Sequence, residues 1–309
     1  MTKPEIIVIT GPTATGKTAL GVKLANVLHG EIVSADSMQV YKHMDIGTAK
    51  PTVKERCGVP HHLLDIISPS EDYSVARYVE DATKCIDDIR KRGKMPVLVG
   101  GSGLYIDSLI AGRTFSARGE SDLRKQLEDE FDKTGGLVML EKLRRIDTDS
   151  AAKLHSNDKK RIIRALEAFI TTGKTISEHD VESRSIPPRY NAIKFALTFS
   201  QRVELYDRIN RRVDDMMLNG LVDEVASLLD MGVSPKNTAM QAIGYKEISA
   251  ALLGYSDMAS AEEKIKMESR RYAKRQLTWL RRDDEILWIS RDNNPDYDVE
   301  VEKILQFTE

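Results

Sequence analysis

The 309-residue chain has little cysteine, no excess of charge of one sign and no long apolar run. Two cysteines, Cys57 and Cys85, can form neither a disulfide framework nor a four-ligand zinc site of their own, which favours a reducing compartment. The 46 lysines and arginines nearly balance the 48 aspartates and glutamates, which excludes a uniformly basic nucleic-acid coat. No run approaches the roughly 20 apolar residues that span a bilayer, and none near the N-terminus fits a signal peptide. We expect a cytoplasmic protein without a membrane partner.

The first third of the chain alternates short apolar runs with helical patterns, which is typical of a parallel α/β sheet. Apolar runs predict strands at 6–9, 32–33, 95–99, 193–199 and 286–289. A helix is expected over residues 74–92, ending at Gly93. Residues 121–180 are rich in charge and helical in pattern, with almost no strand signal. This change of character indicates a helical insertion into the α/β core.

The segment Gly11–Thr18 (GPTATGKT) fits the P-loop pattern GxxxxGK[ST] at every fixed position. It follows an apolar strand and opens a helix, which is the context that the motif requires. Glycines let backbone N–H groups surround an anion at a helix N-terminus, and the lysine adds a full positive charge. The residues predicted to bind a diphosphate or triphosphate are Gly11, Thr13, Ala14, Thr15, Gly16, Lys17 and Thr18.

These patterns predict a P-loop NTPase-like parallel sheet core interrupted by a helical insertion domain. We expect the first part of the core over residues 1–113, the insertion over 114–192, and the completion of the core over 193–309.

One feature of nucleotide-hydrolysing P-loop proteins is missing. They carry an acid after a later strand to organise magnesium, but the strand ending at Val99 runs into Gly100-Gly101-Ser102-Gly103. The nearest acid is Asp36, after the second strand, and the carboxyl ends of parallel strands face the ligand crevice. A carboxylate there can hold a metal or act as a general base. The alternative is that Asp36 only caps a turn or a helix.

Further motifs recur in order from about residue 5 to residue 290. They are Asp36–Tyr41 (DSMQVY), Asp45–Pro51 (DIGTAKP), His61–Asp65 (HHLLD), Gly100–Tyr105 (GGSGLY), Asn157–Glu167 (NDKKRIIRALE), Ala242–Glu247 (AIGYKE) and Arg271–Trp279 (RYAKRQLTW). Together with the P-loop, they closely resemble the tRNA dimethylallyltransferase family of bacterial type, also called tRNA isopentenyltransferase. The resemblance implies transfer of dimethylallyl from dimethylallyl diphosphate to N6 of the adenosine 3′-adjacent to the anticodon. The tRNAs would be those reading codons that begin with U, and pyrophosphate would be released.

The resemblance also implies roles for individual residues. Asp36 would take the proton of the adenine amine, while Lys17, Thr18, Arg212 and Mg²⁺ would stabilise the charge on pyrophosphate, with Thr18 as the metal contact. Arg208 lies four residues before Arg212 on the same helical face. Either arginine could instead lie on an exposed helix surface. Ser102 stands where the family more often has threonine, so a hydroxyl is kept.

A base stacked in an anticodon loop must be extruded to reach a buried site. Two basic runs, at residues 153–164 and 266–282, suit RNA binding, although charge alone fits an exposed helix surface as well. Tyr272 and Trp279 lie within the second run and could stack on bases. By resemblance, the expected tRNA contacts are Asp36, Ser37, Met38, Gln39, Ser102, Arg124, Lys160, Arg161, Ile162, Ile163, Arg164, Gln241, Ala242, Ile243, Gly244, Tyr245, Lys246, Lys274, Arg275, Gln276, Trp279 and Arg281.

Two other functions stay open at this point. A small-molecule P-loop kinase would need ATP and leaves both basic runs unexplained, and a non-catalytic RNA-binding module would not need Asp36 beside a complete P-loop. Metal binding at His61-His62 is disfavoured, because adjacent residues of a strand point to opposite faces. No cysteine lies beyond Cys85, so we expect no C-terminal zinc finger of the kind found in some eukaryotic family members. We expect a monomer that binds the tRNA anticodon stem-loop.

Overall fold

The computed structural model describes residues 4–113, 121–185, 187–292 and 296–308, and the chain divides into two compact units. The first unit combines Met1–Ile110 with Arg189–Glu309, and the second comprises Ala111–Pro188. The backbone N–H of Arg189 donates to the carbonyl of Ile110 at 2.8 Å, so the chain leaves and re-enters the first unit at one point. The second unit therefore begins and ends a few residues before the expected limits of 114–192.

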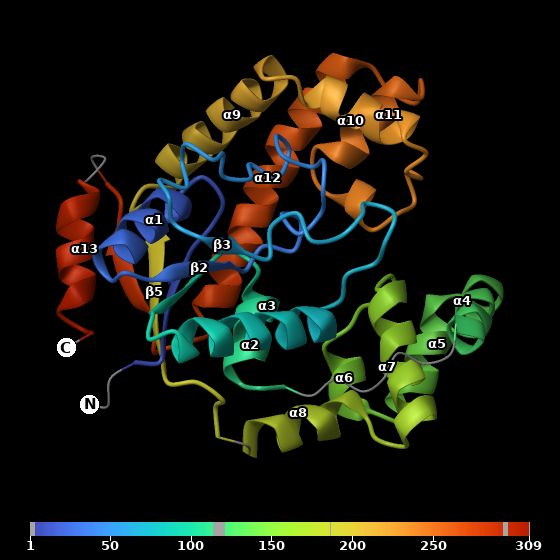
Figure 1. The fold of residues 1–309 in the computed structure, drawn as a ribbon. Coiled ribbons are helices and arrows are strands. Elements are labelled where there is room, and N and C mark those ends of the chain that lie inside the picture. Colours follow the sequence, from blue (N-terminus) through green and yellow to red (C-terminus); the bar gives the residue numbers. More distant parts are fainter. Residues whose placement is uncertain (1–3, 114–120, 186, 293–295, 309) are drawn as a thin grey trace. The chain divides into compact units, whose positions relative to one another are not determined.

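A six-stranded parallel sheet forms the centre of the first unit (Figure 1). Its strands are β1 (Ile6–Thr10), β2 (Glu31–Ser34), β3 (His61–His62), β4 (Pro96–Val99), β5 (Ala192–Thr198) and β6 (Leu287–Ser290). They lie in the order β3-β2-β4-β1-β5-β6, and every pairing is parallel. Strand β1 is buried along its whole length, as its unbroken apolar run predicts for a central parallel strand. The predicted fold class is confirmed.

The first unit also contains helices, several of which pack on the sheet or on one another. They are α1 (Lys17–Val27), α2 (Val75–Lys91), α3 (Gly103–Ile110), α9 (Arg202–Leu218), α10 (Leu221–Asp230), α11 (Tyr245–Leu252), α12 (Met258–Leu280) and α13 (Tyr297–Leu305), with a short 3₁₀ turn at Ala239–Gln241. Helix α2 matches the predicted range closely, because the Ser74 hydroxyl caps its N-terminus by accepting from the Arg77 N–H at 3.2 Å.

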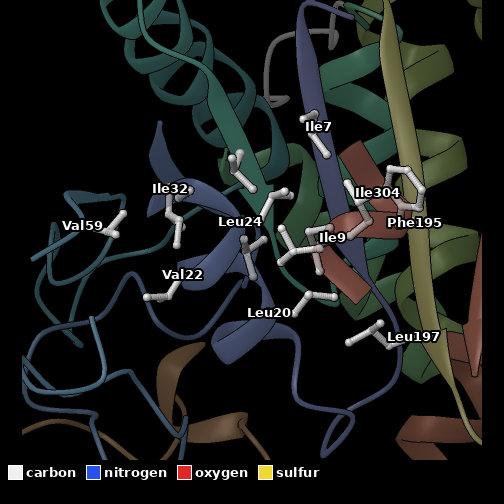
Figure 2. Close-up of a cluster of buried hydrophobic side chains, with 14 residues drawn as sticks. Ile7, Ile9, Leu20, Val22, Leu24, Ile32, Val59, Phe195, Leu197 and Ile304 are labelled. Carbon is white, nitrogen blue, oxygen red and sulfur yellow. The ribbon is translucent and has the colours of Figure 1, made fainter. Parts of the chain in front are cut away.

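The main apolar core lies where α1 and α13 pack on the sheet (Figure 2). Leu20 and Leu24 of α1 belong to the same cluster as Ile7 and Ile9 of β1, and Ile304 brings α13 into it. Gly21 of α1 is needed for this packing, since an added Cβ would lie 2.6 Å from a methyl group of Val99. The core thus holds α1, which starts directly after the P-loop, firmly against the sheet.

All regular secondary structure in the described residues of the second unit is helical. It contains α4 (Ser121–Thr134), α5 (Gly136–Arg144), α6 (Thr148–Ala152), α7 (Lys159–Thr172) and α8 (Ile176–Ser185). Its own core includes Leu127, Leu143, Ile162 and Leu166. Of the helices in the described ranges of both units, none is long and apolar enough to cross a membrane.

Candidate active site

A cleft of about 410 Å³ lies in the first unit, at the carboxyl ends of β1, β2 and β4. It brings together six parts of the chain that are separate in sequence. Its lining includes residues from the P-loop, from the turn Asp36–Gln39, from Gly100-Gly101, from α9 with Arg212, from Gln241–Gly244 and from α12 with Tyr272, Arg275 and Gln276. The cleft is therefore where the predicted catalytic residues meet.

The P-loop turns tightly between β1 and α1. Gly11 (φ +139°) lies so close to β5 that an added Cβ would sit 2.6 Å from the Leu197 carbonyl oxygen. Gly16 adopts a left-handed conformation (φ +88°) immediately before the first residue of α1. Within the loop, the Thr15 hydroxyl donates to the Pro12 carbonyl at 2.8 Å. The loop thus leads directly into the N-terminus of α1, where Lys17 and Thr18 face the cleft.

Lys17 and Arg212 make this part of the cleft strongly electropositive. The Lys17 ammonium donates to the Pro12 carbonyl at 2.7 Å. Burial lowers the pKa of Lys17, and the nearby Arg212 guanidinium lowers it further. The negative charge of Asp36 opposes both effects only in part, so the pKa of Lys17 falls to about 7. Burial likewise lowers the pKa of Arg212, against the attraction of Asp36. Arg212 forms no hydrogen bond or ion pair with another described residue. The guanidinium, together with an amine that a bound anion would keep protonated, therefore faces a single carboxylate, an arrangement suited to binding an anion.

Asp36 begins the turn that follows β2. Its Oδ1 accepts hydrogen bonds from the backbone N–H groups of Met38 (2.8 Å) and Gln39 (3.3 Å), so the carboxylate does cap a turn. No described residue donates to Oδ2, which leaves one oxygen for a substrate. The Ser102 hydroxyl accepts from the Ser37 N–H at 3.1 Å and so ties this turn to the glycine-rich turn after β4. Asp36 can therefore cap a turn through Oδ1 and still act as a general base through Oδ2.

Helix α12 has one face toward the cleft and another toward solvent. Gln276 is buried, and its side chain connects the P-loop with the glycine-rich turn. The Trp279 indole N–H donates to Asp107 at 2.8 Å, whereas Lys274, Arg275 and Arg281 are exposed. Tyr272 lines the cleft. Burial and the charge of Asp36 raise its pKa to about 12, and a hydrogen bond with Ser102 opposes them.

The basic run on α12 is less available than its composition indicates. Lys266 pairs with Asp214 at 2.6 Å and with Glu262 at 2.8 Å. Arg270 donates to Asn210 at 2.5 Å, and Arg271 pairs with Glu268 at 2.7 Å. The exposed cations without such a partner, Lys274 among them, lie toward the C-terminal half of the helix.

The segment Gln241–Lys246 also borders the cleft. Gln241, Ala242, Ile243 and Gly244 line it, while Lys246 is exposed. Tyr245 is buried, and its hydroxyl donates to Glu224 at 2.5 Å. Glu224 also accepts from the backbone N–H groups of Asp45, Ile46 and Gly47 at 2.8–3.1 Å, which fixes another wall of the cleft.

The remaining predicted tRNA contacts belong to the second unit. Lys160 and Arg161 are exposed at the start of α7, whereas Ile162 and Ile163 are buried in the core of that unit. Arg124 pairs with Glu128 at 3.5 Å, and Arg164 pairs with Glu167 at 3.0 Å. Lys160 and Arg161 are therefore the members of their segment best placed to meet a phosphate backbone.

Sequence reasoning missed two contacts that shape the P-loop. Arg208 donates through Nε to the Ala14 carbonyl at 3.1 Å, and Gln276 accepts from the Thr13 N–H at 2.9 Å. The P-loop pattern signals neither, because the partners lie 194 and 263 residues away in the chain. Among the described residues no group of three histidines, cysteines or acids could hold a metal ion. His61 contacts the Val59 carbonyl, and His62 contacts Glu31, both at 2.8 Å.

A parallel sheet with a P-loop after its central strand, an arginine facing that loop and a carboxylate in the same cleft define a P-loop enzyme that acts on a phosphorylated substrate. A family model described as IPP transferase matches residues 39–283, and the chain belongs to this family. The predicted family resemblance is confirmed.

Two relatives illustrate the similarity in sequence. The tRNA dimethylallyltransferase of Acetivibrio thermocellus is 48% identical over 304 residues, covering 98% of this chain and 96% of the relative. That of Carboxydothermus hydrogenoformans is 49% identical over 285 residues, covering 92% and 91%.

Solved structures of the same family are similar to this chain in fold. The tRNA isopentenylpyrophosphate transferase of Bacillus halodurans superposes with a TM-score of 0.74 at 43% identity, covering 99% of this chain and 95% of that one. A eukaryotic dimethylallyltransferase acting on tRNA gives a TM-score of 0.83 at 32% identity, covering 97% of this chain and 77% of that one.

Proposed function

We propose that this protein transfers the dimethylallyl group of dimethylallyl diphosphate to N6 of the adenosine 3′-adjacent to the anticodon, in tRNAs reading codons that begin with U. The observation that carries the proposal is the pairing, within one cleft, of an electropositive P-loop end with the Asp36 carboxylate. One bond breaks, between the allylic carbon and the diphosphate oxygen, and one forms, between that carbon and N6. The N6 proton passes to Asp36, and pyrophosphate leaves intact.

The diphosphate end is built by Lys17, Arg212 and the amides at the start of α1. Negative charge gathers on the leaving oxygen as the carbon–oxygen bond breaks. Cations already fixed in the cleft stabilise that charge without having to reorganise. Arg212 has no protein partner among the described residues to give up, so its guanidinium can turn fully to a pyrophosphate oxygen.

The acceptor end is built by the turn that begins at Asp36. The amine of adenine is a weak nucleophile because its lone pair is delocalised into the ring. Two backbone N–H groups hold Oδ1 of Asp36, so Oδ2 has a fixed direction and can accept the amine proton. Tyr272 lines the same cleft and offers an aromatic face to an extruded base.

The residues present also fit a magnesium ion. Magnesium keeps several waters and binds through one or two protein oxygens together with substrate phosphates. The Thr18 hydroxyl faces the cleft beside Lys17 and has no hydrogen-bond partner among the described residues. It can therefore contact the ion, which would neutralise part of the diphosphate charge.

For the acceptor, we propose the anticodon stem-loop of tRNA. Exposed cations occur on both units, at Lys160 and Arg161 on α7 and at Lys274, Arg275 and Arg281 in or next to α12. They can neutralise the phosphate backbone while the target base enters the cleft.

Transfer of labelled dimethylallyl from its diphosphate to an anticodon stem-loop tests the proposal, with a reaction of ATP and the same RNA run in parallel. Label should enter the RNA in the presence of magnesium. Asp36→Asn should lower the transfer rate by about 10²–10⁴-fold, with stem-loop affinity largely kept. The same change at the exposed Asp230, Asp230→Asn, is the matched control and should leave transfer unchanged. Consumption of ATP without label in RNA would instead indicate a kinase.

A further inference from the structure

The buried side chain of Gln276 joins two loops of the cleft. Its Oε1 accepts a hydrogen bond from the backbone N–H of Thr13, and its Nε2 donates to the carbonyl of Gly101, each at 2.9 Å. Only 7% of the residue is exposed. An added Cβ at Gly101 would lie 2.3 Å from Nε2 and 3.4 Å from the Gly11 carbonyl oxygen. The carboxamide therefore fills the narrow space between the P-loop and the glycine-rich turn.

This contact removes one donor from the phosphate cradle. A P-loop binds phosphates through successive backbone N–H groups. Here the N–H of Thr13 is satisfied within the protein, so the amides that remain are those from Ala14 to Thr18, next to the N-terminus of α1 and to Lys17. Arg208 holds the Ala14 carbonyl at 3.1 Å, so this part of the loop cannot easily turn.

Because the Thr13 N–H is already bonded to Gln276, the loop offers fewer donors to a long anion than to a short one. A diphosphate can stay at the helix end of the loop, where the backbone dipoles and Lys17 favour negative charge most. A third phosphate would extend along the loop toward Thr13. There it would meet the Gln276 carboxamide and find the amide already bonded. Displacing Gln276 would leave its buried amide and the Gly101 carbonyl unpaired, and both losses carry a cost.

We propose that Gln276 determines how many phosphates this loop accepts, by occupying the Thr13 amide and so confining the cradle to a diphosphate. A loop with the GxxxxGK[ST] pattern is then protected against nucleoside triphosphates by a residue outside the pattern. Specificity of this kind works against the wrong ligand and adds little affinity for the right one. The inference rests on the proposed function only in that the loop holds the diphosphate of the donor.

Calorimetric titration of the full chain with inorganic pyrophosphate and with inorganic tripolyphosphate, at one fixed magnesium concentration, tests this proposal. The wild type should bind pyrophosphate at least about tenfold more tightly than tripolyphosphate. Gln276→Ala frees both the amide and the space, and should reduce that preference by about tenfold or more. Gln276→Met frees the amide but keeps most of the bulk, and should reduce it less. Gln306→Ala, the same change at an exposed glutamine of the C-terminal segment, should leave the ratio as in the wild type.

A purely supporting role for Gln276 predicts a different result. Both affinities would then fall together in the two Gln276 variants and their ratio would stay within about twofold of the wild type, which would overturn the proposal. A wild type without preference for pyrophosphate would also overturn it. If circular dichroism shows that Gln276→Ala does not fold, the ratio of the two affinities in Gln276→Met tests the proposal instead. Because no step of transfer is measured, a failure of dimethylallyl transfer would refute the proposed function and leave this result standing.

Discussion

Pyrophosphate binding should draw a proton from solution, and Lys17 is the group that should take it up. Burial and the Arg212 guanidinium lower the pKa of Lys17 to about 7. An amine with that pKa is protonated in only about one molecule in ten at pH 8, but in about nine of ten at pH 6. A bound pyrophosphate places several negative charges beside the amine and raises its pKa again. Binding should therefore take up about 0.9 proton through Lys17 at pH 8 and only about 0.1 at pH 6.

Calorimetry in two buffers of equal pH but different ionisation enthalpy measures this uptake. Lys17→Arg is the matched variant, because arginine keeps the positive charge and stays protonated throughout. Protons taken up by pyrophosphate itself are counted in both proteins. The difference in proton uptake between the wild type and Lys17→Arg is therefore the uptake by Lys17. The reasoning would be refuted by equal uptake in the two proteins at pH 8, or by an uptake difference as large at pH 6 as at pH 8.

The same linkage governs affinity. Because only the protonated amine stabilises the anion, the wild type should lose about tenfold in pyrophosphate affinity per pH unit above pH 7, relative to Lys17→Arg. Parallel affinity profiles of the two proteins between pH 6 and 9 would contradict this.

Arg212→Met should weaken pyrophosphate binding about 10–100-fold, as loss of a charge-assisted hydrogen bond implies, and should reduce proton uptake at pH 8, since Lys17 loses a neighbouring like charge. Glu31→Gln should lower the free energy of unfolding by about 2–4 kcal/mol in urea at pH 7. The cause is that the buried Glu31 carboxylate pairs with Arg92 and Lys94, which lie between α2 and β4, and contacts His62. Those contacts hold its pKa well below 4.5, so this difference should be complete above that pH and shrink as pH falls further. For RNA, Lys274→Ala should reduce the slope of log affinity against log salt by about 0.7–0.9, whereas Lys266→Ala should not, because Lys266 pairs with acids of the protein.

The parts of the fold that follow from local pattern could be predicted from the sequence. Apolar runs located five of the six strands. Ser74 and Gly93 mark the two ends of α2, because the signals that begin and end a helix come from residues close to those ends in the sequence. Strand β3 could not be found in this way. It has only two residues, His61 and His62, and exists because it pairs with β2, a contact that no periodicity records.

The residues of the candidate site also fall into those that the sequence could predict and those that it could not. The P-loop is a contiguous motif, and Asp36 could be placed in the cleft because the carboxyl ends of parallel strands share one edge. The residues that tune the loop could not be inferred. Gln276 looks like one more polar residue in a basic helix, and Arg208 looks like an exposed helical arginine. Their contacts with Thr13 and Ala14 arise only when the sheet brings α9 and α12 to the loop.

Helix α12 shows why a charge count is a poor guide to such a segment. Tyr272, Gln276 and Trp279 recur at helical spacing and share the face toward the cleft and the glycine-rich turn, whereas Lys274 lies on the exposed face. One helix therefore carries the predicted RNA-binding charge on one side and holds the phosphate loop on the other. A substitution that disturbs the helix as a whole would affect both substrates together. Only single changes on separate faces, such as Lys274→Ala and Gln276→Met, can separate RNA affinity from anion selectivity.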